Sequence, residues 1–138
     1  MSEESWEFPP AARSVVLARR AVTGALTRWG LDGLVDAAQL LTSELVTNSV
    51  LHARTTVTVT ITERRGQVRV AVSDGSVIEP ALRRHSMTST TGRGLQMLRS
   101  LADDWGSEVT KTGKTVWFTL STGRDHWAGA QRVSGAEQ

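Results

Sequence analysis

The chain of 138 residues contains no cysteine and no tyrosine, and aromatic residues make up only 5% of it. Without cysteine it can form neither disulfides nor thiolate metal sites. Its three histidines, His52, His85 and His126, are too scattered to indicate a transition-metal site. No apolar run is long enough to cross a bilayer, and the first residues lack the basic and apolar regions of a signal peptide. We therefore expect a cytoplasmic protein that does not contact membranes.

A strong excess of charge is also missing, although the isoelectric point is about 9.9. The formal net charge is only +2, and with no Tyr or Cys to titrate between His and Lys a small basic excess moves the isoelectric point far upward. No motif for reading bases is present either, so we expect no direct binding of nucleic acid. The length and the 39% hydrophobic content are those of one globular domain.

Apolar spacing predicts two helices near the start of the chain. The first begins at Ala11 and ends at Gly30, after a short edge strand over Ser5–Phe8. Asp32 is the expected N-cap of the second helix, which runs to about His52. The buried stripe of the first helix is predicted at spacings of three and four, at Val15, Ala18, Val22, Leu26 and Trp29.

Alternating apolar residues predict strands after these helices. Thr55–Thr62 is followed by the turn Glu63–Gly66 and by a second strand whose apolar face carries Val68, Val70 and Val72. Two further strands are predicted at Ser107–Lys111 and Thr115–Leu120, and Trp117 faces outward from the latter. A third helix opens at Thr91 and is closed by Asp103–Gly106.

The segment LLTSELVTNSVLH, residues 40–52, places Glu44, Asn48 and His52 in one column along the second helix. Leucines flank this column on both sides, so we expect its polar groups within the most apolar arc of the helix. Buried polar groups of this kind mark possible sites, because they are costly unless they are paired or meet a ligand. A partly exposed Glu–Asn pair is the alternative. Asp74 lies an even number of residues after Val72 and so belongs to the apolar face of its strand. It is therefore expected to point into the same layer as Glu44 and Asn48.

Ser76–Thr91 has no clear period and is expected to be a mobile lid or, alternatively, a plain disordered insertion. The segment Thr91-Gly92-Arg93-Gly94 lies at a predicted helix start, where glycines let a phosphate approach the free backbone N–H groups. Glycine is also common in turns for steric reasons, so this signal alone is weak. Two common phosphate-binding motifs do not match the chain. A P-loop ending at Thr115 requires a glycine where Glu108 stands, and a dinucleotide-binding fingerprint requires a glycine where Met97 stands. An acetyltransferase is a weaker alternative, since Ser89 stands where Arg or Gln is usual.

Five features follow one another in the chain: a helix with E-x-x-x-N-x-x-x-H, a strand that ends in Asp-Gly, a loop, a helix that opens with G-x-G-L, and a final strand with G-K-T. This order resembles the ATP-binding fold of the GHKL superfamily, which includes gyrase, Hsp90, histidine kinases and the MutL-type mismatch-repair ATPases. The tract Leu40–Ala53 is most similar to the anti-sigma-factor serine kinases. The resemblance implies a Bergerat fold over residues 1–121, followed by a flexible tail over 122–138. This α/β (α+β) fold is a two-layer sandwich with helices on one face of a mixed, mostly antiparallel sheet.

The resemblance also implies roles for single residues. Glu44 would be the general base or would position the nucleophile, Asn48 would bind Mg²⁺, and His52 would close the helix beside the ribose or phosphates. Asp74 would accept a hydrogen bond from the adenine amine. The remaining ATP-binding positions are Ser76 in the first glycine box, Gly92, Arg93, Gly94 and Leu95 in the second, and Lys114 and Thr115 in the last strand.

Three positions depart from the family pattern. Ser76 replaces a glycine, Lys114 stands where threonine is frequent, and Thr90 stands where kinases often carry a basic residue. The expected function is an ATP- and Mg²⁺-dependent serine kinase that binds a sigma factor or its antagonist, phosphorylates that antagonist and forms a homodimer as its relatives do. The alternative is a noncatalytic nucleotide-binding or partner-sequestering module with a degenerate ATP site.

Overall fold

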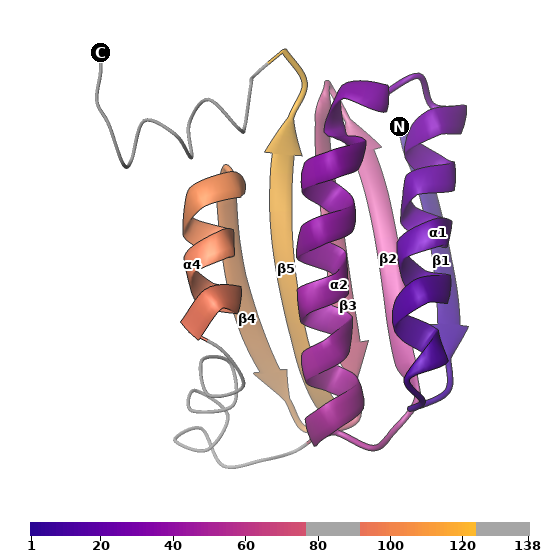
Figure 1. Cartoon of the computed structure of the whole chain (residues 1–138), viewed down its shortest axis with the longest axis vertical. Helices are drawn as coiled ribbons and strands as arrows, with labels where there is room; N and C mark the ends of the chain where they lie inside the picture. Colours follow the sequence, from indigo (N-terminus) through magenta and orange to yellow (C-terminus); the bar gives the residue numbers. More distant parts are fainter. Residues whose placement is uncertain (77–91, 124–138) are drawn as a thin grey trace.

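The protein is a two-layer α+β domain, seen in a computed structural model that describes residues 1–76 and 92–123. Five strands form one sheet in the order β1-β2-β3-β5-β4, and the helices pack on one of its faces (Figure 1). The predicted two-layer sandwich is therefore confirmed. The sheet is fully antiparallel rather than mixed, since each of the pairings that connect its five strands is antiparallel.

Short connections join consecutive elements wherever the structure describes the whole connection. In chain order they are β1 (Ser2–Phe8), α1 (Arg13–Arg28), the 3-10 turn η1 (Asp32–Leu34), α2 (Val35–His52), β2 (Val57–Arg64), β3 (Gln67–Asp74), α4 (Gly92–Leu101), β4 (Asp104–Thr110) and β5 (Gly113–Ser121).

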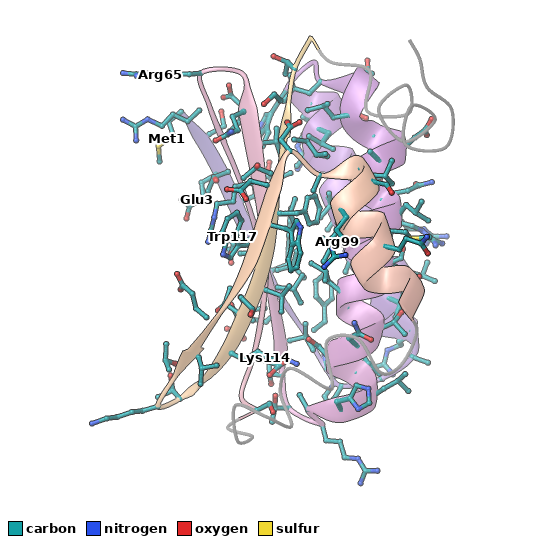
Figure 2. All side chains as sticks on the ribbon, turned by 90° about the vertical axis from the view of Figure 1, so that its left-hand side faces the viewer. Met1, Glu3, Arg65, Arg99, Lys114 and Trp117 are labelled. Atoms are coloured by element: carbon teal, nitrogen blue, oxygen red, sulfur yellow. The ribbon has the colours of Figure 1, made fainter. Side chains whose placement is uncertain are left out.

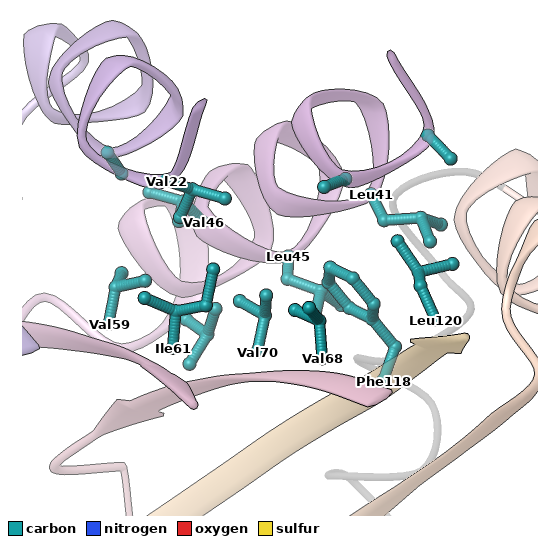
Figure 3. Packing of buried hydrophobic residues seen from close by; sticks show 14 of the residues in the cluster. Val22, Leu41, Leu45, Val46, Val59, Ile61, Val68, Val70, Phe118 and Leu120 are labelled. Atoms are coloured by element: carbon teal, nitrogen blue, oxygen red, sulfur yellow. The ribbon is translucent and has the colours of Figure 1, made fainter. Parts of the chain in front are cut away.

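The hydrophobic core lies between the sheet and the helices. The predicted stripe of α1 is confirmed, because Ala18, Val22 and Leu26 are fully buried. Alternate residues of β2 and β3 meet these side chains, as the period of two predicts. In Figure 3, Val59, Val70 and Leu120 rise from the sheet toward the helices, and the labelled side chains of the helices point toward the sheet: Val22, Leu41, Leu45 and Val46.

Three predicted boundaries were wrong. Strand β1 begins at Ser2 rather than at Ser5, because pairing with β2 extends it to the start of the chain. Asp32 makes no capping hydrogen bond, because η1 intervenes and α2 begins only at Val35. A cap must lie directly before the first helical residue, and Asp32 lies too early. Strand β4 begins at Asp104, which was predicted to close the preceding helix, because Asp104 pairs with Thr119 of β5. Long-range pairing therefore decides this boundary.

The connection between β2 and β3 is a tight turn at Arg65 and Gly66. Both residues have positive φ, 55° and 80°. Two consecutive positive φ values are typical of a type I′ hairpin turn, whose twist matches that of the flanking strands. The turn fixes the register that brings Asp74 to the inner face of the sheet.

The outer face of the sheet carries no helix within the described ranges (Figure 2). Trp117 lies on this face, as predicted from its position between buried Val116 and Phe118. Its indole covers Gly106, where an added Cβ would lie 2.8 Å from the ring, and the Arg69 guanidinium carbon is 5.1 Å from the ring centroid. The indole thus fills the space that glycine leaves on the neighbouring strand.

Arg28 at the end of α1 forms a salt bridge with Glu4 of β1. The hydrogen bond that the guanidinium donates to this carboxylate raises the pKa of Arg28, and the opposite charge adds to the effect. Among the helices described here, none has the length and apolar character needed to cross a membrane. The predicted tail begins at Thr122, whose amide donates to the Gly66 carbonyl at 2.7 Å, and continues outside the described residues.

A substitution of Gly113 with alanine tests the packing at the start of β5. An added Cβ would lie 2.0 Å from the Asp74 carbonyl oxygen, so backbone must move. We expect Gly113→Ala to lower the free energy of unfolding by about 1–3 kcal/mol, as overpacking typically does. Urea denaturation measures this. Gly33→Ala is the control, because its Cβ would meet nothing within 4 Å; equal stability of the two variants would contradict the prediction.

Candidate functional site

The candidate site lies where several element ends meet. The last turn of α2, the end of β3 and the start of β5 lie toward one end of the molecule, and α4 begins on the same side of the sheet (Figure 1). Helix α2 contacts both β3 and α4. Antiparallel pairing and a helix running over the sheet therefore gather residues from sequence positions 44 to 114.

Asp74 is the centre of this region. It is 7% exposed, and its carboxylate accepts hydrogen bonds from the Ser49 hydroxyl at 2.7 Å and from the Ser76 amide at 2.9 Å. These bonds stabilise a buried charge that would otherwise be costly. The inward direction predicted for Asp74 is confirmed.

Ser49 is a site residue that sequence reasoning missed. It follows Asn48 directly and lies one turn after Leu45, on the buried face of α2. That spacing was the available signal, because a serine at a core position needs a polar partner. Its hydroxyl joins α2 to β3 at the carboxylate.

The main chain around Asp74 is held from two sides. The Gly75 amide donates to the Thr55 hydroxyl at 2.8 Å, and Gly113 passes so close to Asp74 that it has no room for a side chain. The Asp74–Ser76 corner is thus fixed by the segment before β2 and by the start of β5. A fixed corner sets the direction of the carboxylate.

The column Glu44, Asn48 and His52 is half-buried rather than buried. The face of α2 toward the sheet is formed by Leu41, Leu45 and Ser49, whereas Leu51 on the other side of the column is 53% exposed. The prediction that the column lies within the most apolar arc of the helix was wrong, and the alternative of a partly exposed Glu–Asn pair agrees better with the structure. The column lies at the edge of that arc, and a ligand beside the helix could reach it.

Lys114 and Thr115 lie on opposite faces of the sheet. Lys114 is 4% exposed and projects from the lower end of β5 toward the helical layer (Figure 2). Its register partner on β3 is Asp74. Thr115 instead shares a hydrogen bond of 2.7 Å with Ser73 on the outer side. The structure therefore brings Lys114 to the site and keeps the Thr115 side chain away from it.

Helix α4 begins at Gly92, as expected for the second glycine box, so the backbone of Gly92 and Gly94 belongs to its first turn. The side chains of Arg93 and Leu95 lie outside the described part of the structure. The same holds for the predicted lid after Ser76, with Arg83 and Arg84. Ser76 itself is 6% exposed beside Asp74.

A comparison with protein families agrees with this geometry. The family model described as the histidine kinase-like ATPase domain matches residues 8–120. The chain belongs to this family. A comparison with curated proteins finds no match. The family is part of the GHKL superfamily, and anti-sigma factor kinases are among its members.

As a histidine kinase-like ATPase domain, the chain is an ATP-binding protein, and such domains generally bind ATP with Mg²⁺. The donor set here suits that ion. Within residues 1–76 and 92–123, no three His, Asp or Glu side chains are grouped so that they could hold a metal. Mg²⁺ takes few protein ligands and keeps water and phosphate oxygens, so a single amide oxygen such as that of Asn48 would fit this ion.

Removing the Ser49 hydroxyl tests the hydrogen bond to Asp74. Ser49→Ala leaves one buried carboxylate oxygen without this donor, and we expect the free energy of unfolding to fall by about 1–3 kcal/mol. The control is Ser43→Ala, because among the described residues Ser43 donates to the Gln39 carbonyl of its own helix and not to a group on the sheet. Thermal and urea unfolding of both variants give the comparison; a Ser49 variant as stable as the Ser43 variant would exclude the role.

Proposed function

We propose that this domain is an ATP-dependent protein serine kinase of the anti-sigma type. It would bind a sigma factor or its antagonist and phosphorylate the antagonist on serine. The observation that supports this best is the position of Glu44 and Asn48, one turn apart on the half-buried edge of α2. A carboxylate and an amide there lie near the end of the molecule that holds the buried Asp74.

Each residue has a distinct chemical task in this proposal. When bound, ATP with Mg²⁺ would supply the phosphoryl group and the charge that neutralises it. Asp74 would orient the base, and Asn48 would hold the metal. Glu44 would accept the hydroxyl proton of the substrate serine while that oxygen bonds to the γ-phosphorus and the bond to ADP breaks.

A noncatalytic module is the second candidate. Ser76 and Lys114, both nearly buried beside Asp74, differ from the family pattern and favour a site that binds nucleotide without efficient transfer. Phosphoryl transfer depends mainly on positioning and charge neutralisation, so small changes can remove turnover and leave binding intact. The output would then be sequestration of a partner.

The proposed partners are a sigma factor, its antagonist and a second copy of the chain. The resemblance of Leu40–Ala53 to anti-sigma-factor kinases supports the first two. The outer sheet face is free of helices in the described ranges and presents Trp117 with Arg69, and such a surface is available for a protein contact.

Calorimetric titration with ATP and Mg²⁺ tests the nucleotide site. We expect Asp74→Ala to lose binding, because the acceptor for the base amine is gone, and Asn48→Ala to lose the dependence on Mg²⁺ while retaining weakened binding. Thr47→Ala, a half-buried neighbour on α2, is the control and should bind normally. An unmodified protein that binds no adenine nucleotide would refute the kinase proposal.

Glu44→Gln separates catalysis from binding. The amide keeps the size of the side chain but cannot take a proton, so phosphoryl transfer should fall by about 10²–10⁴-fold with the ATP affinity nearly unchanged. The assay uses labelled ATP with each anti-sigma antagonist of the source organism and detects phosphoserine by mass spectrometry. If the unmodified protein binds ATP but phosphorylates none of them, the module is the better account.

A further inference from the structure

Helix α1 carries a concentration of positive charge. Its sequence RSVVLARRAVTGALTR contains four arginines and no acidic residue. The formal net charge of the whole chain is only +2, so the residues outside α1 together carry a negative net charge. Arg28 forms a salt bridge with Glu4, whereas within the described ranges no carboxylate forms one with Arg13 or Arg20. Two cations of this helix are therefore left to a partner from outside.

The solvent face of α1 combines these two cations with apolar side chains. Arg13, Val16, Leu17 and Arg20 follow the spacing i, i+3, i+4 and i+7, which places them on one side of the helix. All four are exposed, Val16 at 36% and Leu17 at 41%. Single exposed apolar residues are common on protein surfaces. Here two adjacent ones lie between two arginines, and we call these four residues the α1 surface.

The α1 surface lies on the helical layer, on the opposite side of the sheet from Trp117. Helix α1 packs along α2, and the two helices run in opposite directions, so the start of α1 lies toward the same end of the molecule as the last turn of α2 (Figure 1). That end holds the candidate site. A protein bound to the α1 surface would therefore lie beside the layer that carries Glu44 and Asn48.

We propose that the α1 surface docks an acidic protein partner, through a patch in which Asp or Glu side chains flank an apolar centre. This inference rests on the proposed function, because the partner is the sigma factor or the antagonist that the domain would bind. Guanidinium groups form paired hydrogen bonds with carboxylates, and arginine is enriched at protein interfaces. Arg13 and Arg20 would take the carboxylates, and Val16 and Leu17 would pack against the apolar centre.

An anionic membrane fits this surface less well than an acidic protein does. An amphipathic helix that binds a membrane buries its wide apolar face among the lipid headgroups. In α1 that face is fully buried in the core of the domain, at Ala18, Val22 and Leu26. The apolar side chains left outside, Val16 and Leu17, are too few to anchor a helix in lipid. They match the small apolar centre of a protein contact with a charged rim.

The test is calorimetric titration of the full chain with each purified sigma factor and each anti-sigma antagonist of the source organism. The variants are the double change Arg13→Glu/Arg20→Glu and the single change Leu17→Ala. The matched controls are Arg65→Glu, at the exposed tip of the β2–β3 hairpin on the sheet side (Figure 2), and Val109→Ala, whose side chain is 50% exposed on β4. Vesicles of phosphatidylcholine and phosphatidylserine are the second probe.

Thermal unfolding and titration with ATP check that each variant is folded and keeps its nucleotide site. We expect both readouts to stay unchanged, because the altered side chains are exposed and none belongs to the candidate site. A glutamate at position 13 also suits the positive end of the helix dipole, since Arg13 is the first residue of α1.

A partner that binds the unmodified protein should lose at least about tenfold in affinity for the double arginine variant and about threefold for Leu17→Ala, with both controls unchanged. Added salt should weaken binding to the unmodified protein more than to the arginine variant. Equal partner affinities for the arginine variant and the unmodified protein, or an effect of the arginines on vesicle binding alone, would overturn the inference and leave the proposed function standing. If no sigma factor or antagonist binds the unmodified protein, the proposed function itself is overturned.

Discussion

The need of the buried Asp74 carboxylate for donors is the constraint on which the site depends. The Ser49 hydroxyl can reach this carboxylate only if α2 has one particular position along β3. The Ser76 amide can reach it only if the chain turns immediately after β3. Gly113 adds a steric condition, because β5 must begin against the Asp74 carbonyl. Together these contacts fix the last turn of α2 relative to the sheet, and with it the positions of Asn48 and Glu44. The buried carboxylate thus also sets the geometry of the layer above it.

Most of the fold could be predicted because each element buries one face. The valines of β2 and β3 alternate and the apolar residues of α1 recur every three or four positions, so local spacing reports the side that the core covers. The start of β4 could not be found in this way. Asp104 and Gly106 are not residues typical of strands, and they are extended because β5 offers them hydrogen bonds. The failed capping role of Asp32 has a similar cause, since the η1 turn before α2 decides where the helix begins.

The site could be predicted in part for a different reason. Spacing and resemblance predicted Glu44, Asn48 and Asp74 as site residues, and the inward direction of Asp74, which the structure confirms, follows from strand parity alone. Ser49 was missed because a serine in a helix looks like any surface residue until its partner, 25 positions later in the chain, is known. The half-buried position of the polar column was also beyond reach, because the exposure of Leu51 depends on what packs beside α2 and not on the sequence of α2 itself.

The two faces of β5 separate the chemistry of the pocket from that of the outer surface. Lys114 points to the helices and Thr115 to the opposite side, where it bonds to Ser73, and Trp117 continues that outer face over Gly106. Because side chains alternate, an exchange of residue 114 changes the charge beside Asp74 without altering the face that Thr115 and Trp117 form. The charge beside Asp74 and the outer face of the sheet can therefore change independently in this domain, although adjacent residues of one strand form them. A departure from the family pattern at Lys114 is then compatible with an unchanged outer face.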